Sequence, residues 1–241
     1  MARIHGHKSD EWNERAVPRR SSRTYCSLLL LRTKLEQILD TELPPGDTVL
    51  DYGCGSQPYK PLLMAKFRKY VGADLPGNER AELTIADDGH LPTEENTFDC
   101  VLSSQVLEHV EDPRRYLNEA FRVLKPGGSL IVSTPGVWPY HPHPTDYWRW
   151  TIDGLQREIR GQGFEVVSVK GVFGLESVAL QLWQDATFER LPRIMQPIYT
   201  WSFQLLISLI ERRHPNKLSS DASIYVVLAR KPATVGPAEQ R

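Results

Sequence analysis

Three observations predict an α/β fold with a mostly parallel, doubly wound sheet. Short apolar runs alternate with amphipathic stretches along most of the 241-residue chain. A glycine turn with Gly53 and Gly55 directly follows the first apolar run. The composition, 40% hydrophobic and 24% charged, is ordinary for a globular protein. Folds of this class bind ligands at the carboxyl ends of their strands.

The expected elements alternate along the chain. Leucines with helical spacing predict a helix over 24–40, which the prolines of "PPGD" at 44–47 end: Leu28, Leu31, Leu35 and Leu39. Apolar runs predict strands at 48–52, 69–75, 81–86, 98–105, 129–135, 164–171 and 223–229. Helices are expected at 58–67, 113–124 and 152–160. Asp112 caps the second of these, and "KPGG" at 125–128 ends it.

The chain divides into three parts. We expect an N-terminal tail and helix over 1–43, the main domain over 44–230 and a C-terminal tail over 231–241. Within the main domain, 175–218 is too long for a hairpin loop and has helical character. We expect this helical insertion to fold over the sheet edge or over the mouth of the ligand site.

Charge and cysteine usage narrow the function classes. The net charge of -1 argues against a nucleic-acid partner. Cys26, Cys54 and Cys100 form no C-x-x-C pair, which indicates a reducing compartment with neither disulfides nor a zinc site. The polar N-terminus lacks an apolar signal region, so we expect a cytoplasmic protein. No metal-ligand spacing is present in the sequence, and we expect no metal.

One apolar stretch raises the question of a membrane. Residues 198–210 are strongly apolar but shorter than the roughly 20 residues that a spanning helix needs. The stretch is interpreted as a core or lid helix, with an interfacial helix as the alternative. Under that alternative, 175–213 contacts the inner membrane surface peripherally.

The glycine turn predicts a nucleotide-like ligand without phosphate. A dinucleotide fingerprint needs a third glycine where this chain has Pro58, which argues against a nicotinamide dehydrogenase. Asp51 places a negative charge beside the turn, where a phosphate would be repelled and a cationic ligand group attracted. Asp74, at the end of the next strand, is placed to accept ribose hydroxyls, and Asp87 an adenine amino group.

The ordered segments "VLDYGCG", "YVGADL", "DDGHLPTEENTFDCVLSSQVLEHVEDP" and "RVLKPGGSLIVSTP" resemble the class I S-adenosylmethionine-dependent methyltransferases of the type 11 group. The resemblance covers residues 49–135. It implies a Rossmann-like sheet of seven strands with the last strand antiparallel, and S-adenosylmethionine as cofactor. The family often has a third glycine where this chain has Gln57, so the shape of this loop is expected to differ.

The resemblance also implies roles for individual residues. Asp51, Gly53 and Gly55 hold the aminoacyl end of the cofactor, and Asp74 takes the ribose hydroxyls. The adenine is bound by Asp87 and by the backbone of Asp88 and Gly89. The methionine part is flanked by Ser103, Ser104 and Gln105.

The loop "WPYHPHPTDYWRWT" at 138–151 follows the fifth strand and is expected to carry acceptor chemistry. His141, His143 and Asp146 are candidates for a general base, because a histidine of near-neutral pKa can take a hydroxyl proton. His109 either acts directly or shapes the pocket with Glu108. Acceptor binding is assigned to Tyr140, Tyr147, Trp148 and Arg149. Arg149 alternatively pairs with Asp146 as a structural bridge.

The resemblance implies a methyltransferase, and we expect it to act on a small-molecule or saccharide acceptor, with O-methylation as the reaction. The saccharide follows from a resemblance of the "PY" loop and "HPTDYWRWT" to bacterial methyltransferases of surface-polymer biosynthesis. A lipid-linked or quinone-like acceptor is the alternative, favoured by the apolar insertion. A cofactor-binding partner or regulator without catalysis is the alternative from another class. The sequence leaves the oligomeric state open.

Overall fold

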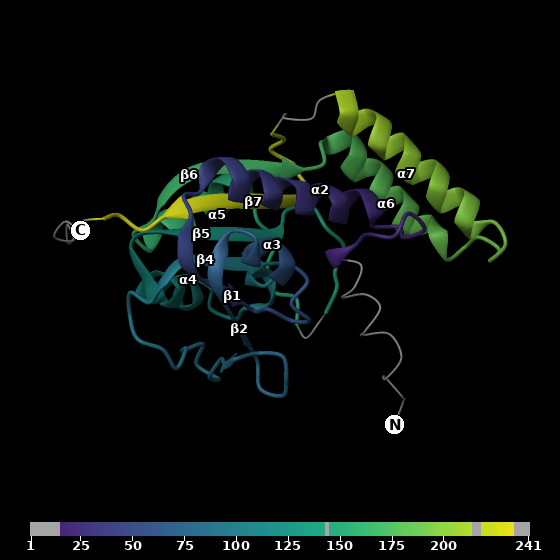
Figure 1. The fold of residues 1–241 in the computed structure, drawn as a ribbon. Coiled ribbons are helices and arrows are strands. Elements are labelled where there is room, and N and C mark those ends of the chain that lie inside the picture. Colours follow the sequence, from purple (N-terminus) through teal and green to yellow (C-terminus); the bar gives the residue numbers. More distant parts are fainter. Residues whose placement is uncertain (1–14, 143–144, 214–217, 234–241) are drawn as a thin grey trace.

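A seven-stranded sheet with helices on both faces forms the centre of the molecule (Figure 1). The computed structural model describes residues 15–142, 145–213 and 218–233. The strand order is β3-β2-β1-β4-β5-β7-β6. The strands are β1 (Gly46–Tyr52), β2 (Phe67–Asp74), β3 (Leu83–Thr84), β4 (Phe98–Ser104), β5 (Leu124–Pro135), β6 (Glu165–Val172) and β7 (Ile224–Arg230). Only β7 runs antiparallel to its neighbours, β5 and β6, which confirms the predicted fold class.

The helices are α2 (Tyr25–Gln37), α3 (Lys60–Met64), α4 (Pro113–Val123), α5 (Ile152–Gly161), α6 (Leu175–Phe188) and α7 (Gln196–Arg213). A π-helical turn, η1 (Ile38–Glu42), continues α2, and a 3₁₀ turn, η2 (Leu107–His109), follows β4. Helices α2 and α3 cover one face of the sheet, and α4 and α5 cover the other.

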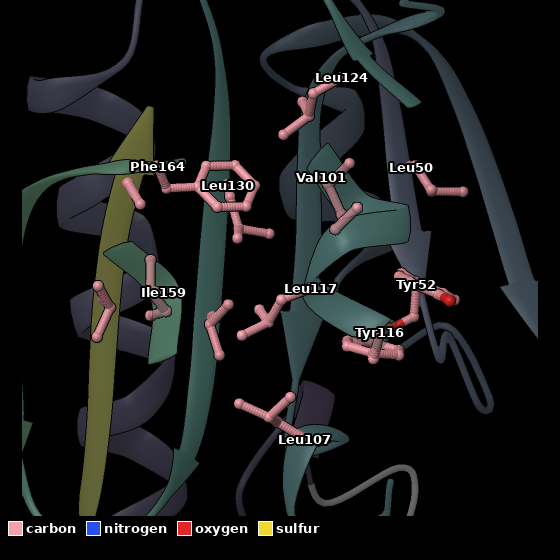
Figure 2. Close-up of a cluster of buried hydrophobic side chains, with 14 of the residues drawn as sticks. Leu50, Tyr52, Val101, Leu107, Tyr116, Leu117, Leu124, Leu130, Ile159 and Phe164 are labelled. Atoms are coloured by element: carbon pink, nitrogen blue, oxygen red, sulfur yellow. Dashed lines mark hydrogen bonds between the residues drawn. The ribbon is translucent and has the colours of Figure 1, made fainter. Parts of the chain in front are cut away.

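Alternation along the strands produces two cores. Val49 and Cys100 pack with α2 and α3, whereas the next residues, Leu50 and Val101, pack with α4 and α5. In the second core the rings of Tyr52 and Tyr116 stack with their centroids 4.1 Å apart (Figure 2). This stack packs the end of β1, which bears the glycine turn, against α4.

Two predicted boundaries were wrong. The helix expected at 58–67 is only α3, and Phe67 begins β2 instead, because its side chain is buried against the α2 core. The fifth strand, expected at 129–135, begins earlier and includes the "KPGG" sequence. Its first residue, Leu124, pairs with Phe98 of β4, and the register shifts before the next pair. The predicted cap was right: Asp112 accepts hydrogen bonds from the backbone of Arg114 and Arg115.

The 175–218 insertion contains an antiparallel hairpin of α6 and α7 that lies beyond the last strands (Figure 1). It begins where β6 ends, at the same sheet edge as the carboxyl ends of β1, β2 and β4. The N-terminal helix α2 contacts β6, β7 and α7. It therefore belongs to the core of the domain and also supports the hairpin.

Candidate functional site

The glycine turn after β1 packs tightly against the segment after β4. Gly53 has φ +83° and donates its N–H to the Ala73 carbonyl over 2.8 Å. A Cβ added at Gly53 would lie 2.5 Å from Cγ2 of Val106. Both the dihedral angle and the space therefore require glycine at this position.

We expect Gly53→Ala to lower the free energy of unfolding by about 1–3 kcal/mol, because it adds a steric clash to left-handed strain. Gly127→Ala is the matched control. Gly127 has φ +79°, but a Cβ there would meet no atom within 4 Å. Urea unfolding of both variants separates the two effects, and equal losses would contradict the role of the Val106 contact.

Asp51 is buried at the end of β1, directly beneath the glycine turn. The hydroxyl of Tyr70 donates a hydrogen bond of 2.8 Å to its carboxyl group. Burial raises the pKa of Asp51 to about 7, and the carboxylates of Asp74 and Glu82 add to this effect. A cationic ligand group would favour the ionised form, so the position suits the amino group of an aminoacyl moiety.

Asp74 joins the loops that follow β1 and β2. Its Oδ2 accepts hydrogen bonds from the N–H of Gly55 over 3.0 Å and from the amide of Asn78. Its Oδ1 accepts one from the Leu75 N–H. The carboxylate is thus held at the strand edge beside the glycine turn, where the sequence predicts ribose binding.

The predicted adenine loop lies at the surface. Asp87 and Asp88 are exposed, and the Asp88 carboxylate pairs with Arg115 over 3.0 Å. The Gly89 carbonyl accepts a 2.7 Å hydrogen bond from the Tyr52 hydroxyl. The Asp88 side chain is therefore engaged within the protein. The Asp87 carboxylate and the Asp88 backbone stay the predicted contacts with adenine.

The residues after β4 divide into two groups. Ser103 is fully buried, and its hydroxyl accepts a hydrogen bond from Tyr116, so it supports the sheet edge from the core side. The contact of Ser103 with the cofactor stays a prediction. Ser104 bonds to the Ser133 hydroxyl over 2.9 Å. Gln105 has φ +57° and continues the edge toward η2.

In the loop after β5, Asp146 and Arg149 form a bidentate ion pair with both N···O distances at 2.6 Å. Arg149 also donates to the carbonyls of Trp138 and Pro139. Hydrogen bonds from Arg149 lower the pKa of Asp146 to about 2. Of the two interpretations of Arg149, the structural bridge is the one that forms.

Three side chains from two segments, Glu108 and His109 of η2 and His141 of the loop after β5, converge beside this ion pair. Glu108 is fully buried, and its Oε1 has no hydrogen-bond partner among the described residues. The Nε2 atoms of His109 and His141 lie 3.7 and 4.0 Å from this oxygen. Burial raises the pKa of Glu108 to about 7 and lowers the pKa of both imidazoles.

Polar groups of the loop after β5 lie beside Nδ1 of both histidines. Nδ1 of His109 lies beside the Thr145 carbonyl. Nδ1 of His141 lies 3.2 Å from the Pro139 carbonyl and 3.4 Å from Oδ2 of Asp146. The Thr145 carbonyl favours a proton on Nδ1 of His109, whereas Nδ1 of His141 also lies 3.3 Å from the Arg149 guanidinium, a donor. The Nε2 atoms of both rings face Glu108. We call Glu108, His109 and His141 the proton-acceptor cluster.

Glu108 was not among the catalytic candidates predicted from the sequence. The sequence analysis gave it only a role in shaping the pocket with His109. Its ligand atoms lie within 4.8 Å of one another, and these residue types also bind divalent cations. The signal in the sequence was the adjacent Glu108 and His109. The partner His141 is contributed by a loop after another strand. His143, the other predicted base, lies outside the described residues.

The predicted acceptor residues are aromatic and partly exposed. Tyr140 and Tyr147 have exposed fractions of 72% and 50%. Trp148 donates its indole N–H to the Val110 carbonyl and stacks on Trp150 with centroids 5.9 Å apart. These rings present flat apolar surface close to the cluster, a common way to bind a sugar or an aromatic ring.

None of the described helices is long and apolar enough to cross a membrane.

The sequence comparisons agree with this geometry. A family model described as a methyltransferase domain matches residues 22–169, more than half of the chain. A probable S-adenosylmethionine-dependent methyltransferase of Mycolicibacterium smegmatis is 32% identical over 53% of this chain and 56% of that protein. A demethylmenaquinone methyltransferase of Clavibacter sepedonicus is 36% identical over 38% of this chain and 44% of that protein. The chain spans about half the length of these curated relatives.

The structural comparison shows the fold. The solved structure of the [4+2]-cyclase SpnF superposes with a TM-score of 0.58 at 21% identity, over 87% of this chain and 83% of that protein. Because one fold hosts different reactions, the family follows from the sequence match and not from this likeness. The chain belongs to the class I S-adenosylmethionine-dependent methyltransferases, and S-adenosylmethionine is its cofactor.

Proposed function

We propose that this chain methylates a hydroxyl oxygen of a small-molecule or saccharide acceptor. The observation that carries the proposal is the convergence of a buried carboxylate and two imidazole Nε2 atoms at the sheet edge. The cluster adjoins the predicted cofactor site, because Val106, which packs on Gly53, precedes it by two residues. A proton acceptor beside the methyl donor is what an oxygen nucleophile requires.

S-adenosylmethionine, when bound, supplies a methyl group that is already activated by its sulfonium. Asp51 and Asp74 would hold the cofactor, and the acceptor oxygen would receive its methyl group while the carbon–sulfur electron pair stayed on sulfur. The hydroxyl proton passes to Nε2 of His141. Asp146, beside Nδ1, stabilises the resulting imidazolium, and Arg149 holds Asp146 in place. Glu108 adds negative charge on the Nε2 side of the ring.

Transfer of a tritiated methyl group tests the proposal. Purified protein is incubated with labelled cofactor and a panel of saccharides, phenols and other hydroxyl compounds, with and without a chelator. We expect label in at least one hydroxyl compound, at a rate that the chelator leaves unchanged. Transfer that requires an added divalent cation would contradict the role of the cluster as proton acceptor. Cofactor binding with no transfer to any acceptor would support the non-catalytic alternative.

A second candidate acceptor is lipid-linked or quinone-like. The exposed apolar side chains of α6 and α7 support it, since such an acceptor has to be reached at a membrane. The relative named as a demethylmenaquinone methyltransferase supports it too. The same assay with a quinol or a polyprenyl-linked saccharide in vesicles distinguishes it from the soluble acceptors.

A further inference from the structure

The polarity of α7 is inverted relative to that of an ordinary surface helix. Its buried positions are Thr200, Gln204 and Ile207, two of which are polar. Its exposed positions include large apolar side chains: Ile198, Trp201, Leu205, Leu206 and Leu209. At 3.6 residues per turn, these side chains occupy a sector of roughly 140°. A helix that packs on a protein core shows the opposite arrangement.

Helix α6 and the turn between the helices follow the same pattern. Trp183 is 64% exposed, whereas three of the four buried residues of α6 are polar: Ser177, Gln181 and Gln184, with Val178 as the fourth. In the turn, the exposed fraction of Ile194 is 85%. The apolar surface therefore extends over both helices and the connecting turn.

Hydrogen bonds between glutamines hold the hairpin together. The amide of Gln204 donates to Gln184 over 2.8 Å and to Gln181 over 3.3 Å. Its Oε1 accepts the N–H of Cys26, which ties the hairpin to α2. The buried side of the hairpin thus combines these polar contacts with Val178 and Ile207, which belong to the α2 core.

Arginines accompany the apolar surface. Arg190 and Arg193 are exposed at the turn, and Arg212 and Arg213 end α7. Four acidic residues belong to the hairpin: Glu176 and Glu189 are exposed, Asp185 pairs with Arg23, and Glu211 accepts the N–H of Gly174. Apolar and tryptophan side chains flanked by arginine are typical of helices that lie at the surface of an anionic bilayer.

We propose that the α6–α7 hairpin binds the surface of an anionic lipid bilayer. Its helices do not cross the bilayer, since no described helix is long and apolar enough to do so. They lie in the interface with Ile194, Ile198 and Trp201 among the acyl chains and the arginines at the headgroups. The hairpin begins at the sheet edge that bears the proposed methyl-transfer site, so docking brings that site to the membrane. This inference deepens the second candidate of the proposed function.

Vesicle flotation with the full chain tests the proposal. The probes are phosphatidylcholine vesicles with and without phosphatidylglycerol. We expect the protein to float with the mixed vesicles and about tenfold less with pure phosphatidylcholine. The double variant Ile198→Glu, Leu205→Glu should lose flotation by about tenfold or more, because each charge has to enter the interface. The matched control is Met64→Glu, Val167→Glu, which changes two exposed apolar residues away from the hairpin and should float like the parent.

Circular dichroism of each variant confirms that it is folded. A parent protein that stays in the dense fraction with both kinds of vesicle overturns the proposal. A parent that fails to float but elutes from gel filtration as a dimer, which the hairpin double variant abolishes, also overturns it and assigns the surface to a second copy. The tritium assay with soluble acceptors is independent of lipid. Loss of flotation with methyl transfer retained therefore rejects only the membrane inference.

Discussion

The Asp51→Asn variant binds S-adenosylmethionine more weakly than the parent by about 2–4 kcal/mol, yet unfolds at a higher temperature at pH 8. Affinity falls because the predicted partner of the cofactor's amino group loses its charge. Stability rises because the buried Asp51 carboxyl, with a pKa of about 7, is ionised at pH 8 at a cost in desolvation. Calorimetric titration and thermal unfolding measure the two effects.

The pH dependence fixes the sign of the stability effect. The folded-state pKa of Asp51 lies above its ordinary value of 3.8, so the folded state binds this proton more tightly than the unfolded state. The parent therefore loses stability as pH rises from about 4 to 7, and the advantage of Asp51→Asn develops over the same interval. Asp146→Asn is the matched control with the opposite sign, because the pKa of Asp146 is lowered to about 2. An Asp51→Asn variant that is less stable than the parent at pH 8 would contradict this account.

Glu108→Gln and His141→Gln each lower kcat by about 10²–10⁴ while cofactor affinity stays nearly unchanged. Both substitutions keep the approximate size of the side chain and remove the charge or the basic nitrogen that the cluster supplies. The His90→Gln variant is the control, because His90 is exposed and pairs with Glu119 outside the cluster. Turnover and cofactor titration are measured for each variant with the acceptor found in the tritium assay. Near-normal turnover in both variants would contradict a catalytic role for Glu108 and His141.

Local signals predicted much of the fold. The Asp112 cap and the end of β1 depend on neighbouring residues, and the structure confirms both. The boundary between α3 and β2 was wrong, because burial of Phe67 against α2 decides it, and α2 is distant in the sequence. The sheet topology confirms the antiparallel last strand that the family resemblance implied, and the sequence match confirms the family.

The part of the site that directly follows the first two strands could be predicted from the sequence. Asp51, Gly53 and Asp74 lie at the expected edge, because parallel strands bring their carboxyl ends together. The proton-acceptor cluster could not be derived in this way, since Glu108 and His141 are contributed by loops after different strands. The apolar run of α7 was interpreted as a core or lid helix, with an interfacial helix as the alternative. Which of its faces is exposed depends on the glutamine contacts with α6.

A crystal structure with S-adenosylhomocysteine bound tests the central claim most directly, because it locates the sulfur that would carry the methyl group. We expect the amino group at Asp51, the ribose hydroxyls at Asp74 and the sulfur directed toward Nε2 of His141, with room for one acceptor oxygen between them. A sulfur that points away from Glu108 and His141, or a cofactor bound at another edge of the sheet, would contradict the proposed site.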